Sequence, residues 1–155
     1  MMSYCSKSKD SVKKYAEVFT PPGVVFQMIL APEFIELLKN LNQTFFDPCV
    51  GEGQFPCAEL VLKMFYNVDN LNADNALAAL SSLHGMDIQA KSVNKCRAHM
   101  LVTFCDAYKF FTDTDFSPST LDKAIPIILQ NFNAGDSLEF MKDLAAFQKK
   151  SERLF

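Results

Sequence analysis

The feature that most restricts the fold is a short apolar run that ends in a carboxylate and is followed at once by a glycine turn. Residues 44–47 (Thr-Phe-Phe-Asp) are typical of a β-strand, and residues 48–53 (Pro-Cys-Val-Gly-Glu-Gly) follow directly. A G-x-G turn lets the backbone bend tightly and approach a ligand without a Cβ atom in the way. Residues 54–66 then have helical apolar spacing, and the free N–H groups of that helix would face the same ligand. The alternative is a tight turn without a ligand.

The rest of the chain predicts alternating helices and strands. Thr20 is expected to cap a helix with Pro21 at its first position. Further helices are expected at 33–41, 54–66, 73–83, 91–104 and 138–155, with another opening at Ser117, while 105–120 is not assigned. The expected strands are 44–47 and 83–88. Residues 125–132 fit either the end of a helix or a strand, and a strand at 127–132 is preferred. This alternation indicates an α/β fold, a parallel sheet with helices on both faces.

Two more carboxylates stand at expected strand ends. In nucleotide-binding α/β folds a carboxylate in the position of Asp87 accepts hydrogen bonds from ribose hydroxyls. Its spacing from Gly53 exceeds the usual roughly 20 residues, which the extra helix at 73–83 explains. An equal alternative is that Asp87 caps the helix after it. Asp136, in Gly-Asp-Ser at 135–137, is suited to an adenine amino group, and the alternative there is again a turn.

Composition limits the class of protein. The 155 residues fit one domain, divided into a flexible arm at 1–14 and a globular domain at 15–155. The net charge of −3 argues against tight DNA binding by the chain alone, so DNA is expected only through a partner. Five cysteines without a C-x-x-C pair, with two histidines, suggest neither a disulfide framework nor a metal site. The apolar runs are too short to span a membrane, and a cytoplasmic protein is expected.

Four segments in this order resemble the N-terminal, S-adenosylmethionine-binding half of adenine-specific (N6) DNA methyltransferases of the phage and restriction–modification type. They are EVFTPP (17–22), DPCVGEGQF (47–55), HGMDI (84–88) and NAGDSL (133–138). The resemblance implies a class I methyltransferase (Rossmann-like) parallel sheet and S-adenosyl-L-methionine as cofactor. It would place the protein in DNA methylation, in the host cytoplasm if phage-encoded.

The resemblance also implies which residues bind that cofactor. Thr20 and Pro21 would lie over its methionine end. Asp87 would bind the ribose hydroxyls, with Ile88 beside the adenine ring, and Asp136 would face the adenine amino group. The glycine loop would hold the amino-acid and ribose portion through Asp47, Pro48, Cys49, Gly51 and Gly53.

One motif of that family has no counterpart in these residues. The enzymes hold the flipped adenine with an [Asn/Asp/Ser]-Pro-Pro-aromatic motif, whereas Pro21-Pro22 here is followed by Gly23. We therefore expect no catalytic residue and a sheet truncated after about three strands. The chain would act as a subunit or fragment. The alternatives are a non-catalytic cofactor-binding or interaction protein, such as a phage decoy or modulator of methylation or restriction, and a structural domain without cofactor.

The truncated sheet carries an expectation about assembly. The strand at 44–47 would become an edge, and exposed edges invite pairing. A homo-oligomer, or a second polypeptide that completes the sheet, is therefore expected. The alternative is that the helix at 138–155 folds back over this edge.

Overall fold

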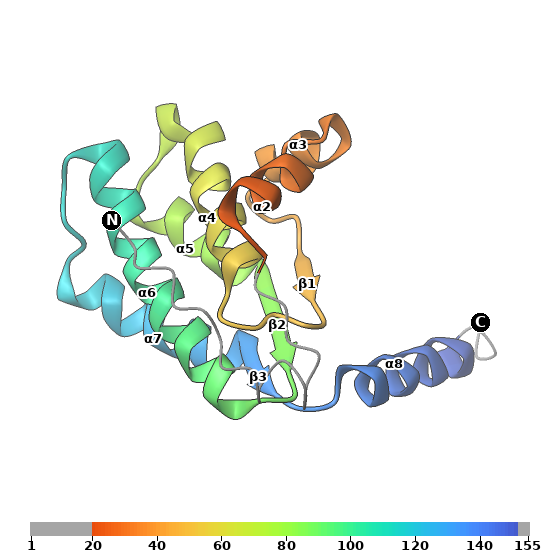
Figure 1. Cartoon of the computed structure of the whole chain (residues 1–155). Coiled ribbons are helices and arrows are strands. Elements are labelled where there is room, and N and C mark those ends of the chain that lie inside the picture. Colours follow the sequence, from red (N-terminus) through yellow and green to blue (C-terminus); the bar gives the residue numbers. More distant parts are fainter. Residues whose placement is uncertain (1–19, 152–155) are drawn as a thin grey trace.

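The computed structural model describes residues 20–151, with side chains up to residue 145. The arm expected at 1–14 lies outside the described residues. Along the described chain (Figure 1) the elements are α2 (Pro22–Ile29), α3 (Pro32–Lys39), β1 (Phe45–Asp47), α4 (Gln54–Tyr66), the 3₁₀ turn η1 (Val68–Asn70), α5 (Ala73–Ser81), β2 (Leu83–Asp87), α6 (Ala90–Thr112), α7 (Pro118–Asn131), β3 (Phe132–Ala134) and α8 (Ser137–Ser151).

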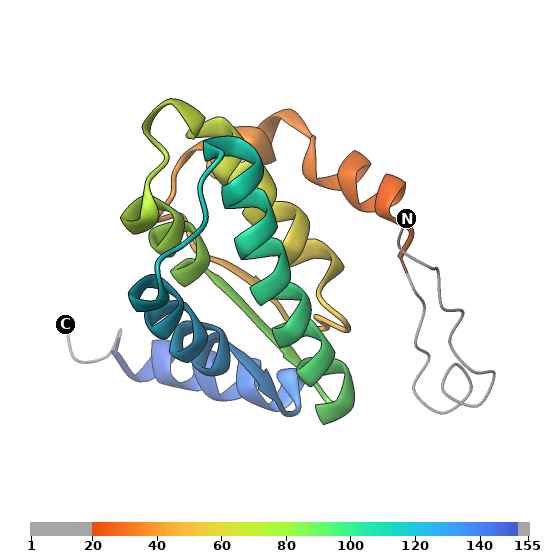
Figure 2. The same ribbon diagram turned by 90° about the vertical axis from the view of Figure 1, so that its left-hand side faces the viewer.

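The three strands form one parallel sheet in the order β1-β2-β3. Phe45 pairs with Leu83, and Gly85 pairs with Phe132. Helix α4 packs along α6, α5 packs along α7, and α6 also contacts α5 and α7 (Figure 2). All four helices contact β2, on the face where Leu83 and Gly85 are buried. The expectation that such helices cover both faces of the sheet is therefore wrong for these four. The expected α/β fold with a parallel sheet is thus confirmed for the described residues, and its arrangement is compatible with a Rossmann-like fold.

The main core lies where these four helices meet the sheet. The expected inward face of α6 is confirmed, because Val93, Cys96, Met100 and Phe104 are all buried. Gly85 in β2 is packed so closely that an added Cβ would lie 2.6 Å from Val50 Cγ2. A second apolar cluster joins α2 and α3 to α4 through buried residues, which are Val25, Ile29, Leu38, Ala58 and Leu62.

A buried lysine fixes the chain that leads from α3 into β1. Lys63 on α4 is fully buried, and its Nζ donates to the carbonyl oxygens of Asn40, Leu41 and Gln43 over 2.9, 3.2 and 2.8 Å. These carbonyls follow the end of α3, and among the described residues only that of Asn40 has a second donor, the Gln43 N–H. Burial lowers the pKa of Lys63 to about 8, against the opposing effect of Glu59.

Helix α2 begins one residue later than expected. Pro21 is the residue before the helix, in extended conformation with ψ 142°, and Pro22 is the first helical residue. A residue that precedes proline is kept out of the helical region by the proline ring, so Pro21 cannot be helical. The expectation that Thr20 caps the helix is therefore wrong, and no side chain caps this end.

Residues 105–131 also differ from expectation. Helix α6 continues eight residues beyond Phe104, and Phe116 in the following loop stacks between Phe104 and Tyr108, at 4.3 and 3.9 Å between ring centroids. The helix opening at Ser117 is confirmed, and Ser117 accepts a hydrogen bond from the Thr120 N–H. The strand expected at 127–132 is wrong, since α7 runs to Asn131 and the strand is 132–134. The buried stripe Thr120, Ala124 and Ile128 has helical spacing and holds α7 against the core.

Helix α8 confirms the expected C-terminal helix over the part that is described. It leads away from the end of β3 and projects beyond β1 (Figure 1), with little contact to the other elements. Among residues 20–151, no helix is both long enough and apolar enough to cross a membrane.

Candidate functional site

The glycine loop that follows β1 (residues 48–53) and Asp87 at the end of β2 meet at the carboxyl ends of these two strands. Asp87 Oδ2 accepts a hydrogen bond from the Gly51 N–H over 3.0 Å, and Asp87 Oδ1 accepts one from the Gln89 N–H over 2.9 Å. The second bond tightens the turn into α6, whose first helical residue is Ala90. Asp87 therefore joins the glycine loop to the turn before α6. The alternative that it caps α6 is wrong, because the N-cap residue is Gln89 and no side chain caps this end.

The two glycines of the loop have different physical roles. Gly53 has φ 92°, and an added Cβ would lie 2.8 Å from Cys96 Sγ, so this position requires glycine for close packing against α6. Gly51 also has a positive φ, 54°, but the nearest atoms to an added Cβ lie at 4.0 Å. Gly51 therefore needs glycine for its backbone conformation, and the space beside it is open to a ligand.

Asp47 is the last residue of β1 and directly precedes this loop. Its Oδ1 accepts a hydrogen bond from the Cys49 N–H over 2.9 Å. Burial raises the pKa of Asp47 and the negative charge of Asp87 raises it further, while the Cys49 N–H lowers it. Desolvation and the same two carboxylates raise the pKa of the Cys49 thiol, which is exposed and in the reduced state. The negative charges of Asp47 and Asp87 act on each other, and two such carboxylates favour a ligand with cationic or hydroxyl groups.

The end of the second strand also presents an apolar side chain. Ile88 directly follows Asp87 and is 68 % exposed. It offers a flat partner a contact surface beside the carboxylate. This is the position that the resemblance implies for the adenine ring.

The third strand-end carboxylate has a local role. Asp136 Oδ1 accepts hydrogen bonds from the N–H groups of Leu138 and Glu139, over 2.9 and 3.3 Å, and so satisfies the first turn of α8. The Gly135 N–H donates to the Asp87 carbonyl oxygen over 2.9 Å, which places Asp136 beside the end of β2. Contact of Asp136 with an adenine amino group stays a prediction.

Pro48, Thr20 and Pro21 are the remaining expected site residues. Pro48 is half-buried in the glycine loop. Thr20 and Pro21 stand immediately before α2, and none of the hydrogen bonds described above ties them to the strand ends. Helix α2 packs against α4, the helix that follows the glycine loop.

Two residues of α6 hold the loop in place and were not expected from the sequence. Lys95 Nζ forms an ion pair with Glu52 Oε1 at 2.9 Å, and His99 Nδ1 lies 2.8 Å from the Glu52 carbonyl oxygen. The spacing of Lys95 and His99 puts them on one face of the helix. Only the packing of α6 against the loop, which the sequence does not state, reveals their role.

Glu59 is a buried carboxylate on α4. Burial raises its pKa to about 7, the negative charge of Asp47 raises it as well, and Lys63 lowers it. Glu59 thus feels the charge of Asp47 on one side and forms an electrostatic pair with the buried Lys63 on the other.

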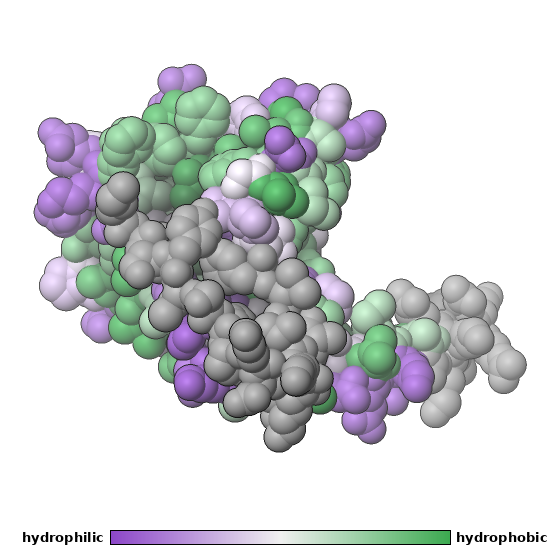
Figure 3. All heavy atoms as spheres, viewed as in Figure 1, coloured by the Kyte–Doolittle hydropathy of each residue, from purple (hydrophilic) through white to green (hydrophobic). Residues whose placement is uncertain are grey.

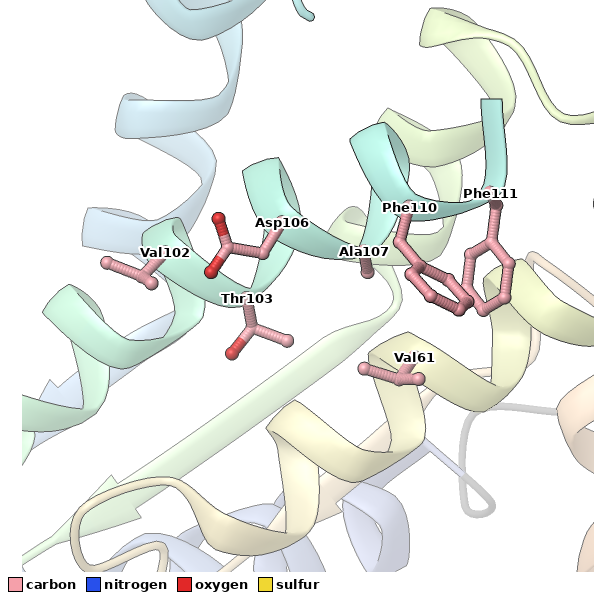
Figure 4. Close-up of a pocket in the computed structure, with 7 residues that line it drawn as sticks. All are labelled: Val61, Val102, Thr103, Asp106, Ala107, Phe110 and Phe111. Atoms are coloured by element: carbon pink, nitrogen blue, oxygen red, sulfur yellow. The ribbon is translucent and has the colours of Figure 1, made fainter. Parts of the chain in front are cut away.

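A separate pocket of about 380 Å³ lies between α4 and α6 (Figure 4). Its lining is mostly apolar and contains one carboxylate, Asp106, beside Val61, Val102, Thr103, Ala107, Phe110 and Phe111. At 1.5 Å per helical residue, Asp106 lies roughly 24 Å along α6 from its first residue. The pocket is therefore remote from the strand ends. Among the described residues, no group of three His, Cys, Asp or Glu side chains could hold a metal ion.

Comparisons with protein-family models, with curated proteins and with solved structures find no match for this chain. The geometry at the strand ends and the sequence motifs therefore carry the functional argument.

Proposed function

We propose that this chain binds S-adenosyl-L-methionine at the carboxyl ends of its parallel strands, as the cofactor-binding part of an adenine-N6 DNA methyltransferase. The observation that carries the proposal is the hydrogen bond between Asp87 and the Gly51 N–H. It joins two motifs that lie 36 residues apart in the chain. Ligands of open α/β sheets bind at this end of the strands.

The residues at the strand ends fit the chemistry of that cofactor. Its adenosine would find the Asp87 carboxylate for the ribose hydroxyls and Ile88 for the ring. Its positively charged sulfonium and ammonium groups would be favoured by the carboxylate pair of Asp47 and Asp87, whereas phosphates would be repelled. The open space at Gly51 leaves room for close approach.

Transfer of the methyl group to DNA would need residues that these 155 do not include. No aromatic Pro-Pro motif for the target base is present, and the net charge is −3. We propose that the chain acts as a subunit or fragment, with the catalytic motif and the DNA contacts supplied by another polypeptide. A non-catalytic role, in which cofactor or partner binding alone modulates methylation or restriction, is the alternative.

Calorimetric titration of the 155-residue chain with S-adenosylmethionine tests the proposal, with ATP as the matched ligand that keeps adenosine but carries phosphates. We expect binding of the first and none of the second. Absence of heat and of a thermal shift with millimolar S-adenosylmethionine would overturn the proposal. Formation of N6-methyladenine in DNA by the chain alone would instead contradict its catalytic incompleteness.

A further inference from the structure

The outer edge of β1 carries no strand in the described part of the chain. Strand β1 pairs with β2 alone, and the Phe45 N–H donates to the Ser82 carbonyl oxygen. In a parallel pair the backbone groups of successive residues point to alternate sides. The N–H and C=O of Phe46 therefore point to the open edge, as a donor and an acceptor ready for another strand.

Both faces of the sheet are covered beside this edge. Because successive side chains point to opposite faces, Phe45 and Phe46 mark the two faces of β1. The Phe45 ring stacks on Phe34 of α3 at 5.7 Å, and the Phe46 ring contacts Phe140 of α8 at 5.6 Å. The edge thus lies between two helical layers, α3 on one face and α8 on the other.

These layers expose apolar side chains around the edge. Phe46 is 40 % exposed, and the neighbouring exposed apolar residues are Phe34 and Leu37 on α3 and Met141 and Leu144 on α8. The molecular surface is indented between the block formed by α2 and α3 and the projecting α8 (Figure 3). The alternative that α8 folds over the edge is not what the structure shows, since α8 touches Phe46 and then projects beyond it.

We propose that a second copy of this chain occupies the edge, with the two β1 strands antiparallel about a twofold axis perpendicular to the sheet. Phe46 would face Phe46 of the other copy, and their N–H and C=O groups would form a closed pair of hydrogen bonds. The result is a continuous six-stranded sheet. Isologous contacts of this kind are the commonest way in which identical chains associate.

The twofold axis matches the helical layers as well as the strands. Rotation about an axis perpendicular to the sheet reverses the strand direction but keeps each face on its own side. The projecting α8 of each copy then lies over the Phe46 face of the other, and the two α3 helices meet on the Phe45 face. The apolar residues that a single copy exposes on both faces become buried together.

Charge does not oppose this contact. The exposed charges beside the edge are of both signs, with Glu36 and Lys39 paired at 2.6 Å on α3. On α8, Lys142 stands between Glu139 and Asp143. Two identical surfaces of mixed sign can therefore approach without the repulsion that a single-sign patch would cause. The inference does not depend on cofactor binding.

Sedimentation of the full chain across the micromolar range tests the proposal. We expect a species of twice 17.4 kDa. Phe46→Lys and Leu144→Lys should each weaken association by about tenfold or more. Phe110→Lys, at an exposed site in the α4/α6 pocket, is the matched control and should leave it unchanged. A 17.4 kDa monomer throughout, or a dimer insensitive to both edge variants, overturns the proposal and leaves the edge to a different polypeptide.

A second measurement does not depend on how the charged variants fold. In the antiparallel pair, Phe46→Cys would place two thiols opposite each other at about 5.5 Å between Cα atoms, a separation suited to a disulfide. We expect mild oxidation to link Phe46→Cys into covalent dimers and to leave Ile125→Cys, exposed on α7, largely unlinked. Equal linking of both variants contradicts the proposed contact.

Discussion

The carboxylate of Asp87 accepts a hydrogen bond from the Gly51 N–H, and this bond joins the end of β2 to the glycine loop after β1. The same carboxylate accepts the Gln89 N–H through its other oxygen. Any ligand that bridges Asp87 and the loop therefore meets a site whose two halves are already connected.

Replacement of Asp87 by alanine should affect both stability and binding. The N–H groups of Gly51 and Gln89 lose their acceptor, so the free energy of unfolding should fall by about 1–3 kcal/mol. S-Adenosylmethionine affinity should fall by a similar free energy, measured by calorimetry below the melting temperature. Asp122→Ala, at an exposed position on α7 away from the strand ends, is the comparison and should change neither quantity. Equal affinity of the Asp87→Ala variant and the unaltered chain would remove Asp87 from the site.

The two glycines at positions 53 and 23 should respond oppositely to alanine. Gly53→Ala forces a Cβ to within 2.8 Å of Cys96 Sγ at φ 92°, and we expect a loss of about 2–3 kcal/mol in the free energy of unfolding. Gly23 lies inside α2 with nothing within 4 Å of an added Cβ. Gly23→Ala should be neutral or stabilise by about 0.5–1 kcal/mol. Urea denaturation measures both, and a tolerated Gly53→Ala would contradict the close packing.

Much of the fold follows from local pattern, and the errors have identifiable causes. Helix α4 and strand β1 were predictable because their apolar spacing agrees with the glycine turn that joins them. The segment 127–131 was misassigned, because its run of isoleucines favours a strand and Pro126 discourages a helix. Tertiary contacts decide otherwise: the Asn131 amide donates to the carbonyls of Ser81 and Leu83, and Arg97 donates to those of Leu129 and Phe132.

The candidate site was predictable only in part, for a similar reason. Its motif residues carry a recognisable spacing, so Asp47, Gly51 and Asp87 could be named from the sequence. The residues that support the loop, Lys95 and His99, have no motif and act through the packing of α6. A local pattern cannot distinguish them from solvent-exposed residues on the same helix.

The buried Lys63 should be essential for stability. Lys63→Met keeps the approximate volume but removes the donor to the carbonyls of Leu41 and Gln43, and leaves that of Asn40 with the Gln43 N–H alone. We expect the free energy of unfolding to fall by on the order of 3 kcal/mol at pH 7. Lys39→Met is the matched control, since its ion pair with Glu36 is exposed and should change stability by less than about 1 kcal/mol. Equal effects of the two substitutions would show that the three hydrogen bonds do not stabilise the fold.

The contribution of Glu59 to stability should fall as pH rises from about 4.5 to 7. Its pKa in the folded protein is about 7 against an ordinary value of 4.5, because burial disfavours the carboxylate. The folded chain therefore holds a proton that the unfolded chain has released in this window. The free energy of unfolding contributed by this proton is fully present below pH 4.5 and is lost as the pH passes 7.

Glu59→Gln tests this dependence, because glutamine keeps the shape and cannot titrate. Over this window the unaltered chain should lose on the order of 3 kcal/mol through Glu59, and the variant should lack that part of the decline. The pKa of Asp47 is also raised, so the free energy of unfolding of the variant should still fall slightly with pH through Asp47. Glu36→Gln, at an exposed position, should keep the full slope. Urea titrations at a series of pH values measure the effect. A Glu59→Gln variant with the same pH slope as the unaltered chain would show that Glu59 titrates near its ordinary value, and that its burial does not govern the acid side of the stability profile.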